Sequence, residues 1–395
     1  MPTGEDLKQN TAYHIGFKPL RVGIIRLSSL GDCVVSAAFL ANFRNTLRQN
    51  GFKPHISWFV DSRFAGILEH SPQIDDLHTL TMKHIPIRQV FSQLKNLNTL
   101  EPFDVLIDMQ GLMKSALIGK FIKKRFFVGF SACSARESLS ALFYTNRVHI
   151  AYKEHILVRN ALLLHQSLEI INEHFGTPRS VSKKPLDSLP LPQSLQDFSS
   201  PRTLLDDMLS LRTRSFDFEA STPALLPYPK ILLVLESSNP TKCYATRLFA
   251  ECIDIISNEL KRIQYKNVQI VLLAHSEPTK CEEIINLVKQ KDNLTLTTLT
   301  NLSLDEVKSL IARVNLVIGG DTGITHLAWA LGIASITLYG STPMERFALL
   351  SPQNIALSEN KNPRYKKDDF SINDILPSQI AYCALQLLES NTSRD

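Results

Sequence analysis

The stretch from Leu316 to Leu327, LVIGGDTGITHL, carries the strongest indication of fold in this chain. Its apolar beginning predicts a buried strand, and a glycine- and hydroxyl-rich turn then leads directly into a helix. Gly332 ends that helix, and a second β-rich run occupies residues 335–340. The stretch therefore predicts one β-turn-α-β unit of a parallel sheet.

The turn between this strand and helix is suited to binding a phosphate. The first amides of a helix have no partner within it and lie at the positive end of its dipole. We expect Gly319, Gly320 and Gly323 to let the backbone approach a ligand, and Thr322 and His326 to add side-chain donors. At the carboxyl end of a parallel sheet, such a turn is typical of a nucleotide-diphosphate site. The alternative is that the aspartate of the turn is a helix N-cap with a buried histidine behind it.

Length and composition indicate a globular protein of two domains. The chain has 395 residues, of which 44% are hydrophobic and 21% charged, and this length exceeds what one core usually supports. The net charge of +5 is too small to indicate a nucleic-acid partner, but it suits an anionic ligand or membrane surface. The six cysteines form no CxxC pair, and neither a signal peptide nor an apolar run of about 20 residues is visible. We therefore expect a cytoplasmic protein with reduced thiols, soluble or peripheral to a membrane.

Strand and helix patterns alternate in two separate parts of the chain. The ranges expected to form strands, besides the opening stretch, are 21–27, 55–60, 104–108, 231–235 and 268–274. The ranges expected to form helices are 33–47, 113–121, 245–259, 303–312 (opened by a capping box) and 375–389. Apolar strands between helices predict parallel sheets covered on both faces.

The expected fold class is α/β, with two doubly wound, Rossmann-like domains facing each other across a cleft. A proline-rich polar stretch separates them, with one short helix expected at 204–211. The expected divisions are an N-terminal extension (1–20), a first domain (21–179), a connection with an insertion (180–229), a second domain (230–374) and a C-terminal helix (375–395) that packs back on the first domain.

Asp32 is the candidate catalytic group of the first domain. It follows the first strand at the start of a helix, where the simplest role is a helix cap. The functional role is a general base at the cleft that takes a proton from a hydroxyl nucleophile. Gly31 would then leave room for the substrate.

Two strand ends of the second domain carry further polar groups. Ser237 and Ser238, with Lys242 four residues later, could hold a diphosphate and offset charge on a departing nucleotide. Glu277 follows the next strand and could bind ribose hydroxyls. In isolation, solvated turns are the alternative for both. These polar groups and the Gly-rich turn are all expected at the carboxyl edge of the same sheet, and this coincidence favours a ligand site.

Three motifs closely resemble the lipopolysaccharide heptosyltransferases. They are RLSSLGD at 26–32, DMQGLMKS at 108–115 and GDTGITH at 320–326. The resemblance extends from about Arg21 to the terminal helix, with the exception of the connection. The segment 129–144 is more similar to heptosyltransferase I than to heptosyltransferase II.

The sequence also departs from that family at a few positions. The family usually has Thr-Thr where Ser237 and Ser238 stand, and often Trp where Cys243 stands. The extension at 1–20 and the long insertion are additional. None of these differences removes a group that the reaction needs.

The resemblance implies the two-domain GT-B fold and an inverting transfer of L-glycero-D-manno-heptose from ADP-heptose. The acceptor would be a 3-deoxy-D-manno-octulosonic acid (Kdo) residue of lipid A, in the inner core of lipopolysaccharide, and the enzyme would act at the cytoplasmic face of the inner membrane. The first domain would bind the acceptor and the second the donor, without metal or cofactor. Inversion needs a single in-line attack, so one base suffices, and Asp32 is matched to it.

The resemblance and the positions of the basic residues also assign the two substrates. Residues matched to the donor are Ser237, Ser238, Lys242, Glu277, Asp321, Thr322, Gly323 and His326. Residues assigned to the acceptor are Ser29, Gly31, Lys83, Arg88, Gln110, Lys114 and Arg136. For any single lysine or arginine among them, a solvated surface charge is the alternative.

Three other functions are compatible with the sequence. Heptosyltransferase II, which adds the second heptose, differs only through the 129–144 segment. A GT-B nucleotide-sugar epimerase would turn over the activated sugar alone and would leave Arg136 without a role. A non-catalytic sugar-nucleotide binding protein would not need Asp32.

Overall fold

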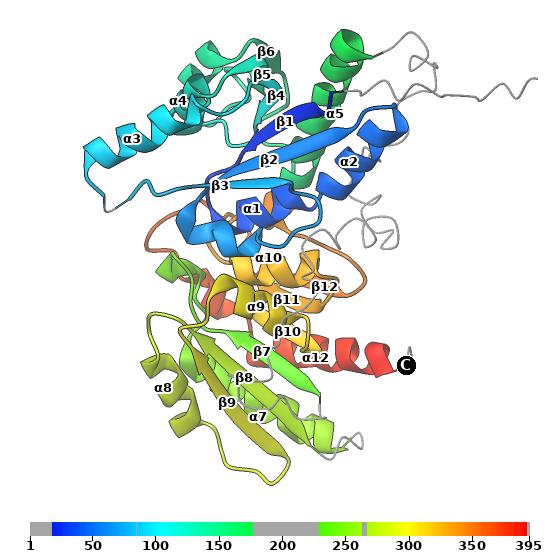
Figure 1. The fold of residues 1–395 in the computed structure, drawn as a ribbon. Helices are drawn as coiled ribbons and strands as arrows, with labels where there is room; N and C mark the ends of the chain where they lie inside the picture. Colours follow the sequence, from blue (N-terminus) through cyan, green and yellow to red (C-terminus); the bar gives the residue numbers. More distant parts are fainter. Residues whose placement is uncertain (1–17, 84, 177–228, 263–266, 393–395) are drawn as a thin grey trace, which may run out of the picture.

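The computed structural model describes residues 18–83, 85–176, 229–262 and 267–392. They form two α/β halves, residues 18–176 (the first half) and 229–392 (the second half), stacked one above the other (Figure 1). Each half contains a six-stranded sheet, with the orders β3-β2-β1-β4-β5-β6 and β12-β11-β10-β7-β8-β9. In both, the first strand of the half lies in the middle and the chain winds outward to either side. This is the Rossmann order, and it confirms the predicted pair of doubly wound domains.

The first half begins with its central strand. Its strands are β1 (Leu20–Ile25), β2 (Pro54–Asp61), β3 (Asp76–Leu80), β4 (Phe103–Asp108), β5 (Lys124–Phe130) and β6 (Asn146–Val148). Its helices are α1 (Leu30–Ala37), α2 (Leu40–Gln49), α3 (Ile87–Leu97), α4 (Met113–Phe121) and α5 (Ile156–Phe175), with 3-10 helices η1 (Ser62–Ile67) and η2 (Ser138–Phe143).

The second half repeats this winding. Its strands are β7 (Lys230–Val234), β8 (Val268–Ala274), β9 (Leu294–Thr300), β10 (Leu316–Gly320), β11 (Ala334–Leu338) and β12 (Asn354–Leu357). Its helices are α7 (Thr246–Arg262), α8 (Thr279–Leu287), α9 (Leu304–Ile311), α10 (Gly323–Ala330), α11 (Met344–Phe347) and α12 (Pro377–Thr392), with 3-10 helices η6 (Pro240–Lys242) and η7 (Ser371–Asp374).

Most of the inner strands agree with the prediction, and the edge strands were missed together with β5. Strands β1, β2, β4, β7, β8, β10 and β11 lie where apolar or β-rich runs predicted them. The edge strand β3 is only half-buried along most of its length, so it lacks a continuous apolar run. The helix predicted at 33–47 is two helices: α1 packs against α10 of the second half and against α5, and α2 packs against α5. The short helix predicted at 204–211 lies outside the described residues.

The C-terminal helix does not pack where we expected. Helix α12 lies against α7, β10 and β11, and its Ile380, Ala381 and Ala384 are buried in the core of the second half. Its apolar face completes that core, so the expectation that it returns to the first half is wrong.

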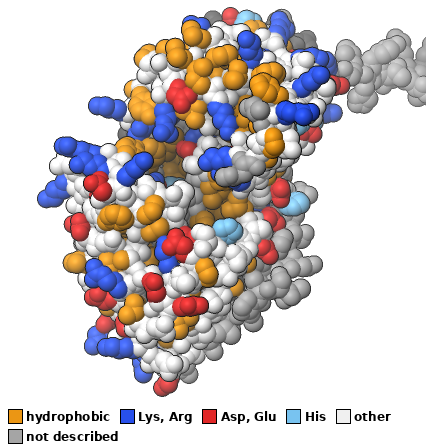
Figure 2. Space-filling view, turned by 90° about the vertical axis from the view of Figure 1, so that its left-hand side faces the viewer, with side chains coloured by type: hydrophobic (Ala, Val, Ile, Leu, Met, Phe, Trp, Pro, Cys, Tyr) orange, Lys and Arg blue, Asp and Glu red, His pale blue; other side chains and the backbone are white. Residues whose placement is uncertain are grey.

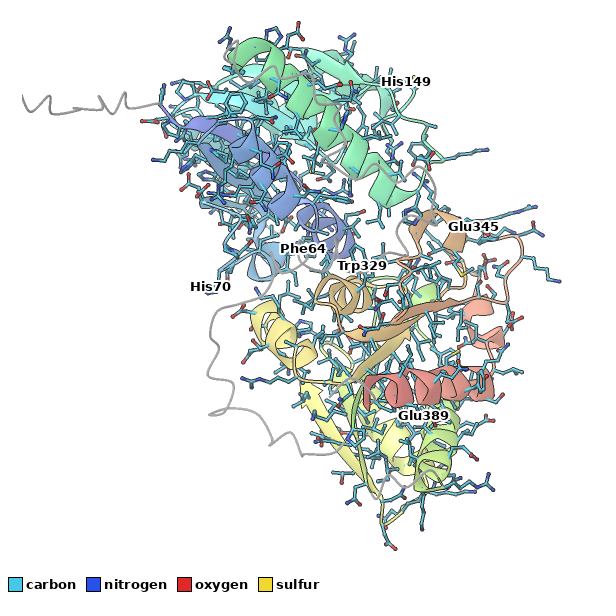
Figure 3. All side chains as sticks on the ribbon, turned by 90° about the vertical axis from the view of Figure 1, so that its right-hand side faces the viewer. Phe64, His70, His149, Trp329, Glu345 and Glu389 are labelled. Atoms are coloured by element: carbon cyan, nitrogen blue, oxygen red, sulfur yellow. The ribbon has the colours of Figure 1, made fainter. Side chains whose placement is uncertain are left out.

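The two halves meet through packed helices. One apolar cluster joins Val34 and Val35 of α1 to Leu327 and Ala328 of α10. Phe64 of η1 and Trp329 of α10 lie at this junction (Figure 3). No helix among the described residues has the length and apolar character needed to cross a membrane.

A buried lysine strengthens the junction at η1. Lys308 of α9 donates from Nζ to the backbone carbonyls of Gly66 (3.3 Å) and Glu69 (3.0 Å) in the first half. Its ammonium also lies 3.1 Å from Asp305 Oδ1. These contacts satisfy carbonyls at the end of η1, which would otherwise lack donors.

Candidate active site

Most of the polar groups predicted from the sequence collect where the two sheets face each other. In a doubly wound sheet, ligands bind at the carboxyl ends of the central strands, where the winding reverses. Those strands are β1 and β4 in the first half and β7 and β10 in the second. Two adjoining cavities, of about 690 and 450 Å³, open between them.

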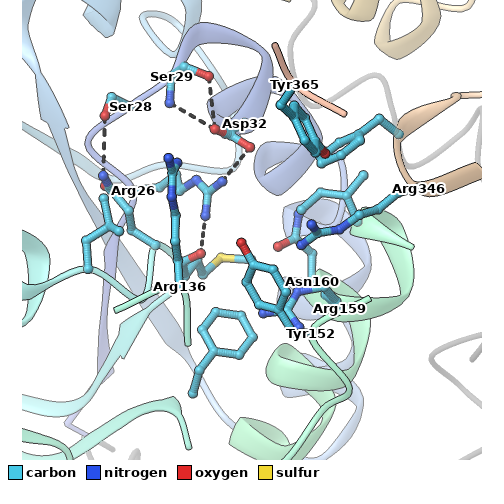
Figure 4. A pocket seen from close by; sticks show the side chains of 16 residues that line it. Arg26, Ser28, Ser29, Asp32, Arg136, Tyr152, Arg159, Asn160, Arg346 and Tyr365 are labelled. Carbon is cyan, nitrogen blue, oxygen red and sulfur yellow. Dashed lines mark hydrogen bonds and ion pairs between the residues drawn. The ribbon is translucent and has the colours of Figure 1, made fainter. Parts of the chain in front are cut away.

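The two cavities differ in character. The larger, here called the arginine cavity, is lined by Arg26, Arg136, Arg159 and Arg346 (Figure 4). The smaller, here called the α10 cavity, is lined by the start of α10 and the loop after β7. Asp32 and Ser29 line both. Asp32 is therefore the carboxylate at the point where the two spaces meet.

Asp32 is held in place from two sides. Its Oδ2 accepts hydrogen bonds from the backbone N–H (3.1 Å) and the hydroxyl (2.9 Å) of Ser29, and its Oδ1 lies 2.7 Å from the Arg26 guanidinium. Burial by itself would raise the pKa of Asp32, but the Arg26 charge and the Ser29 hydrogen bonds lower it below its ordinary value. The side chain remains 34% exposed. Asp32 therefore completes a capping box whose N-cap is Ser29, and it also presents an ionised carboxylate to both cavities.

The loop after β4 positions Gln110 beside this group. Buried Asp108 accepts hydrogen bonds from the amides of Gln110 (2.8 Å) and Gly111 (3.2 Å) and from the Tyr144 hydroxyl (2.9 Å). Gly111 has φ +67°, a backbone conformation that residues with a side chain rarely adopt. The Gln110 amide oxygen in turn accepts from the backbone N–H of Leu27 (2.8 Å). The DMQG motif thus fixes a polar side chain in the arginine cavity.

Asp321 contacts both Lys242 and His326. Its carboxylate pairs with the Lys242 ammonium and lies 2.9 Å from Nε2 of His326. Burial opposes ionisation, but His326 and Lys242 outweigh it and hold the pKa of Asp321 well below its ordinary value. The N-cap of α10 is Thr322, so the alternative of Asp321 as the cap is wrong. The pairing holds Lys242 over the start of α10.

The glycines of the Gly-rich turn make room for protein atoms. A Cβ on Gly320 would lie 1.8 Å from the carbonyl oxygen of Lys242, and one on Gly323 would lie 2.4 Å from Leu30 Cγ. A Cβ on Gly31 would lie 2.8 Å from His326. These glycines therefore let η6, α1 and α10 pack closely. Gly31 and Gly323 also line the α10 cavity, so their expected contact with a ligand stays a prediction. Gly31 lines the α10 cavity and not the arginine cavity.

The loop after β7 brings Ser237 and Ser238 to the α10 cavity, together with Lys242. Glu277 is not among the residues that line it, because its carboxylate pairs with Lys280 at 3.0 Å. Glu236 lines the cavity instead. Its carboxylate accepts from the backbone amides of His275, Ser276 and Glu277 at 2.7–3.0 Å. That network joins the ends of β7 and β8.

The acceptor assignments divide into two groups. Ser29, Gln110 and Arg136 line the arginine cavity. Lys83, Arg88 and Lys114 do not line either cavity. All three are exposed, because their side chains extend from the surface near α3 and α4.

Several residues of the site were not found from the sequence. They are Arg26, Tyr152, Arg159, Asn160, Glu236, His275, Ser276, Arg346 and Tyr365. Arg26, Glu236, His275 and Ser276 could have been found, because each lies within two residues of the carboxyl end of β1, β7 or β8. The others come from α5, from α11 and from loops whose position depends on the packing of the two halves.

The arrangement favours a particular kind of chemistry. A lysine and a helix start lie on one side of an ionised carboxylate, and four arginines lie on the other. Such a site can hold a diphosphate, bind an anionic second substrate and accept a proton between them. Among the described residues, no group of three or more His, Cys, Asp or Glu side chains could hold a metal ion.

Comparisons with known proteins agree with this arrangement. The family described as glycosyltransferase family 9 (heptosyltransferase) matches residues 87–376. Lipopolysaccharide heptosyltransferase 1 of Campylobacter coli is 29% identical over 367 residues, which cover 90% of this chain and 95% of that protein. The enzyme of the same name from Salmonella typhimurium is 24% identical over 330 residues, or 82% of this chain and 89% of that one. The solved structure of E. coli heptosyltransferase WaaC with ADP-2-deoxy-2-fluoro heptose superposes with a TM-score of 0.62 at 20% identity, covering 94% of this chain and 99% of that chain.

Proposed function

Because the chain belongs to glycosyltransferase family 9, the heptosyltransferases, we propose that it transfers L-glycero-D-manno-heptose from ADP-heptose to a Kdo residue of lipid A. The chain is a glycosyltransferase of lipopolysaccharide core biosynthesis, and its relatives favour heptosyltransferase I over the alternatives. The observation that carries the detailed proposal is the shared position of Asp32. It faces the α10 cavity and the arginine cavity at once.

In this proposal Asp32 is the general base. A hydroxyl of the acceptor in the arginine cavity gives its proton to Asp32 and attacks the anomeric carbon of the donor from the side opposite the diphosphate. One displacement inverts the configuration, and no covalent enzyme intermediate is needed. The low pKa of Asp32 keeps it ionised and ready to accept the proton.

The donor diphosphate would lie at the start of α10. Backbone amides of that helix start, the hydroxyls of Ser237, Ser238 and Thr322, and the Lys242 ammonium can share its charge. Lys242 and the helix dipole would stabilise the departing ADP without a metal ion, with Asp321 and His326 around the heptose. For the ribose, Ser276 and His275 already line the cavity, whereas Glu277 would have to release Lys280.

The direct test is to incubate the protein with ADP-heptose and Kdo-lipid A and to weigh the products. Asp32→Asn should retain ADP binding and lower turnover by about 10²–10⁴-fold, because the amide cannot accept the proton. An Asp32→Asn protein with turnover within a few-fold of the parent would leave Asp32 as a helix cap only. Transfer only to already heptosylated acceptor would favour heptosyltransferase II, and conversion of ADP-heptose without acceptor would favour an epimerase.

We further propose that the protein acts in the cytoplasm at the anionic surface of the inner membrane. Four apolar side chains of the first half are exposed on contacting elements. They are Phe91 (59%) on α3, Leu117 (46%) on α4, and Leu139 (61%) and Leu142 (72%) on η2. Figure 2 shows apolar side chains on this face of the first half, with Lys and Arg side chains among them.

The charges on this face support a lipid partner. Lys114 and Lys120 lie one turn either side of Leu117 on the exposed surface of α4. The nearby acidic side chain, Glu137, is engaged in the protein, because its carboxylate accepts a hydrogen bond from the backbone N–H of Met113 at 2.6 Å. Apolar side chains with flanking lysines are the combination that binds anionic lipid surfaces.

Sedimentation with vesicles of phosphatidylglycerol and phosphatidylethanolamine tests this surface. Replacing Leu139 and Leu142 together by serine should reduce the bound fraction, as should raising the salt concentration. Replacing Ile285 and Leu287 on α8, which are also exposed, should leave binding unchanged. Equal loss in both double variants would rule out this surface as the specific docking site.

A further inference from the structure

We propose that Arg346, from the second half of the chain, binds an anionic group of the acceptor, so that the acceptor subsite is shared between the two halves. This inference rests on the proposed function and assigns a ligand contact to a residue outside the acceptor domain. The relevant chemistry is a carboxylate or a phosphate oxygen.

Arg346 lies in α11, yet it faces the first half across the arginine cavity. Its guanidinium carbon is 4.3 Å from the centre of the Tyr152 ring, which belongs to the first half. Beside it, His155 Nε2 of the first half lies 3.0 Å from the carbonyl oxygen of Ala348. The two halves are therefore in contact at this edge of the cavity, and Arg346 is held there by stacking.

Arg26 pairs with Asp32 in this cavity, but Arg159 and Arg346 lack such a partner in the part of the chain that the structure describes. Among the described residues, neither Arg159 nor Arg346 forms an ion pair with an acidic side chain. Arg159 donates instead to the carbonyls of Ala151 (2.8 Å) and Ser134 (2.7 Å). Burial and the nearby Arg346 charge lower the pKa of Arg159 to about 10. Two like charges at one cavity wall favour an anion between them.

A buried amide marks the same place. Asn160 lines the arginine cavity and is only 1% exposed, yet neither its Nδ2 nor its Oδ1 has a hydrogen-bond partner. The Nε of Arg346 is also buried and without a partner. Such groups are costly unless a ligand satisfies them, and an oxyanion can accept hydrogen bonds from Asn160 Nδ2 and Arg346 Nε. Figure 4 shows Asn160 and Arg346 on one side of the cavity and Arg26 and Arg136 on the other.

These contacts have a consequence for catalysis. The ligand anion would touch Arg159 and Asn160 of the first half and Arg346 of the second. Acceptor binding would therefore hold the two halves together around Asp32. In the absence of the acceptor, the like charges of Arg159 and Arg346 oppose this closed arrangement.

Steady-state kinetics on the full chain tests the assignment. Arg346→Ala should raise the acceptor KM by about 10- to 100-fold, while the Kd for ADP measured by calorimetry stays within about twofold. Arg346→Lys should be intermediate, because it keeps the charge and loses the forked donor and the stacking. Arg247→Ala, an exposed arginine of the same half, is the matched control and should leave both constants unchanged.

Two modified acceptors identify the anion. One acceptor has its Kdo carboxyl reduced, and the other has its lipid A phosphates removed. The difference in acceptor KM between the parent and Arg346→Ala should become smaller on the acceptor that lacks the anionic group bound by Arg346, and this result identifies the group. A difference that persists on both acceptors would overturn the subsite.

Asn160→Leu separates a ligand contact from a structural one. Because the amide has no partner in the protein, leucine should leave the melting temperature unchanged or raise it, while the acceptor KM rises. A lower melting temperature with an unchanged KM would overturn the assignment. If the parent does not transfer heptose, the proposed function fails; if it does and Arg346→Ala has the parent KM, only the shared subsite fails.

Discussion

Arg26 controls the protonation of Asp32, and replacing it by methionine should change the pH dependence of transfer. Methionine keeps most of the length and removes the charge that lies 2.7 Å from Asp32 Oδ1. Without that charge, burial dominates and raises the pKa of Asp32. The base would then become protonated at a higher pH, and the acid limb of kcat/KM would move upward.

The structure sets the size of this effect. Two charges about 4 Å apart interact by about 4 kcal/mol at an effective dielectric constant of about 20. Because a third of Asp32 is exposed, solvent screening reduces this to about 1.5–3 kcal/mol. At about 1.4 kcal/mol per pH unit, the acid limb should move up by about 1–2 units.

The assay is kcat/KM for heptose transfer as a function of pH, which reports groups of the free enzyme. Arg21→Met is the matched control, because Arg21 lies at the other end of β1 and pairs with Glu101 at 3.5 Å. It should leave the acid limb in place. Identical acid limbs for the folded parent and Arg26→Met would refute the role of the ion pair in setting the base.

Three further predictions address the donor site and the junction. Lys242→Ala should weaken ADP binding by about 10- to 100-fold, because a charged donor is lost; calorimetry with equal ADP affinity would contradict the diphosphate assignment. Gly320→Ala should destabilise the protein by about 1–3 kcal/mol or more in urea unfolding, because its Cβ would lie 1.8 Å from the Lys242 carbonyl, and unchanged stability would show that η6 moves freely. Burial lowers the pKa of His155 below its ordinary value of 6.5, so the folded protein resists protonation and loses stability as the pH falls through 6.5 toward the lower folded pKa. The melting temperature of the parent should therefore fall more between pH 7 and pH 5 than that of His155→Gln, and parallel curves would exclude His155 as the cause.

Helix starts and strand-turn-helix units could be predicted from residues that are close together in the sequence. The capping box at the start of α9 is present, since Ser303 N–H donates to Glu306 (2.7 Å) and Glu306 N–H donates to the Ser303 hydroxyl (3.3 Å). The unit β10-turn-α10 also lies where the sequence predicted it. Such features depend on side chains three or four positions apart and on continuous burial of central strands, both of which are visible in the sequence.

The sequence also indicated which strands are followed by polar side chains of the site, because the carboxyl ends of parallel strands meet at one edge of a sheet. Asp32, Gln110, Lys242 and Asp321 all reached the cavities in this way. Glu277 did not: its carboxylate pairs with Lys280 and does not line the α10 cavity.

The pairing of distant residues depended on the tertiary structure alone. Arg346 and Tyr152 are almost two hundred positions apart and meet only because two independently wound sheets are docked through α1 and α10. The packing of α12 on α7 was decided in the same way, by which core had an apolar surface left to cover. The spacing of apolar residues in the sequence shows which face of a helix or strand is buried, but it does not show which other element covers that face. The sequence by itself therefore determined the two parallel sheets and their polar edges, whereas docking of the halves decided which charges share a cavity.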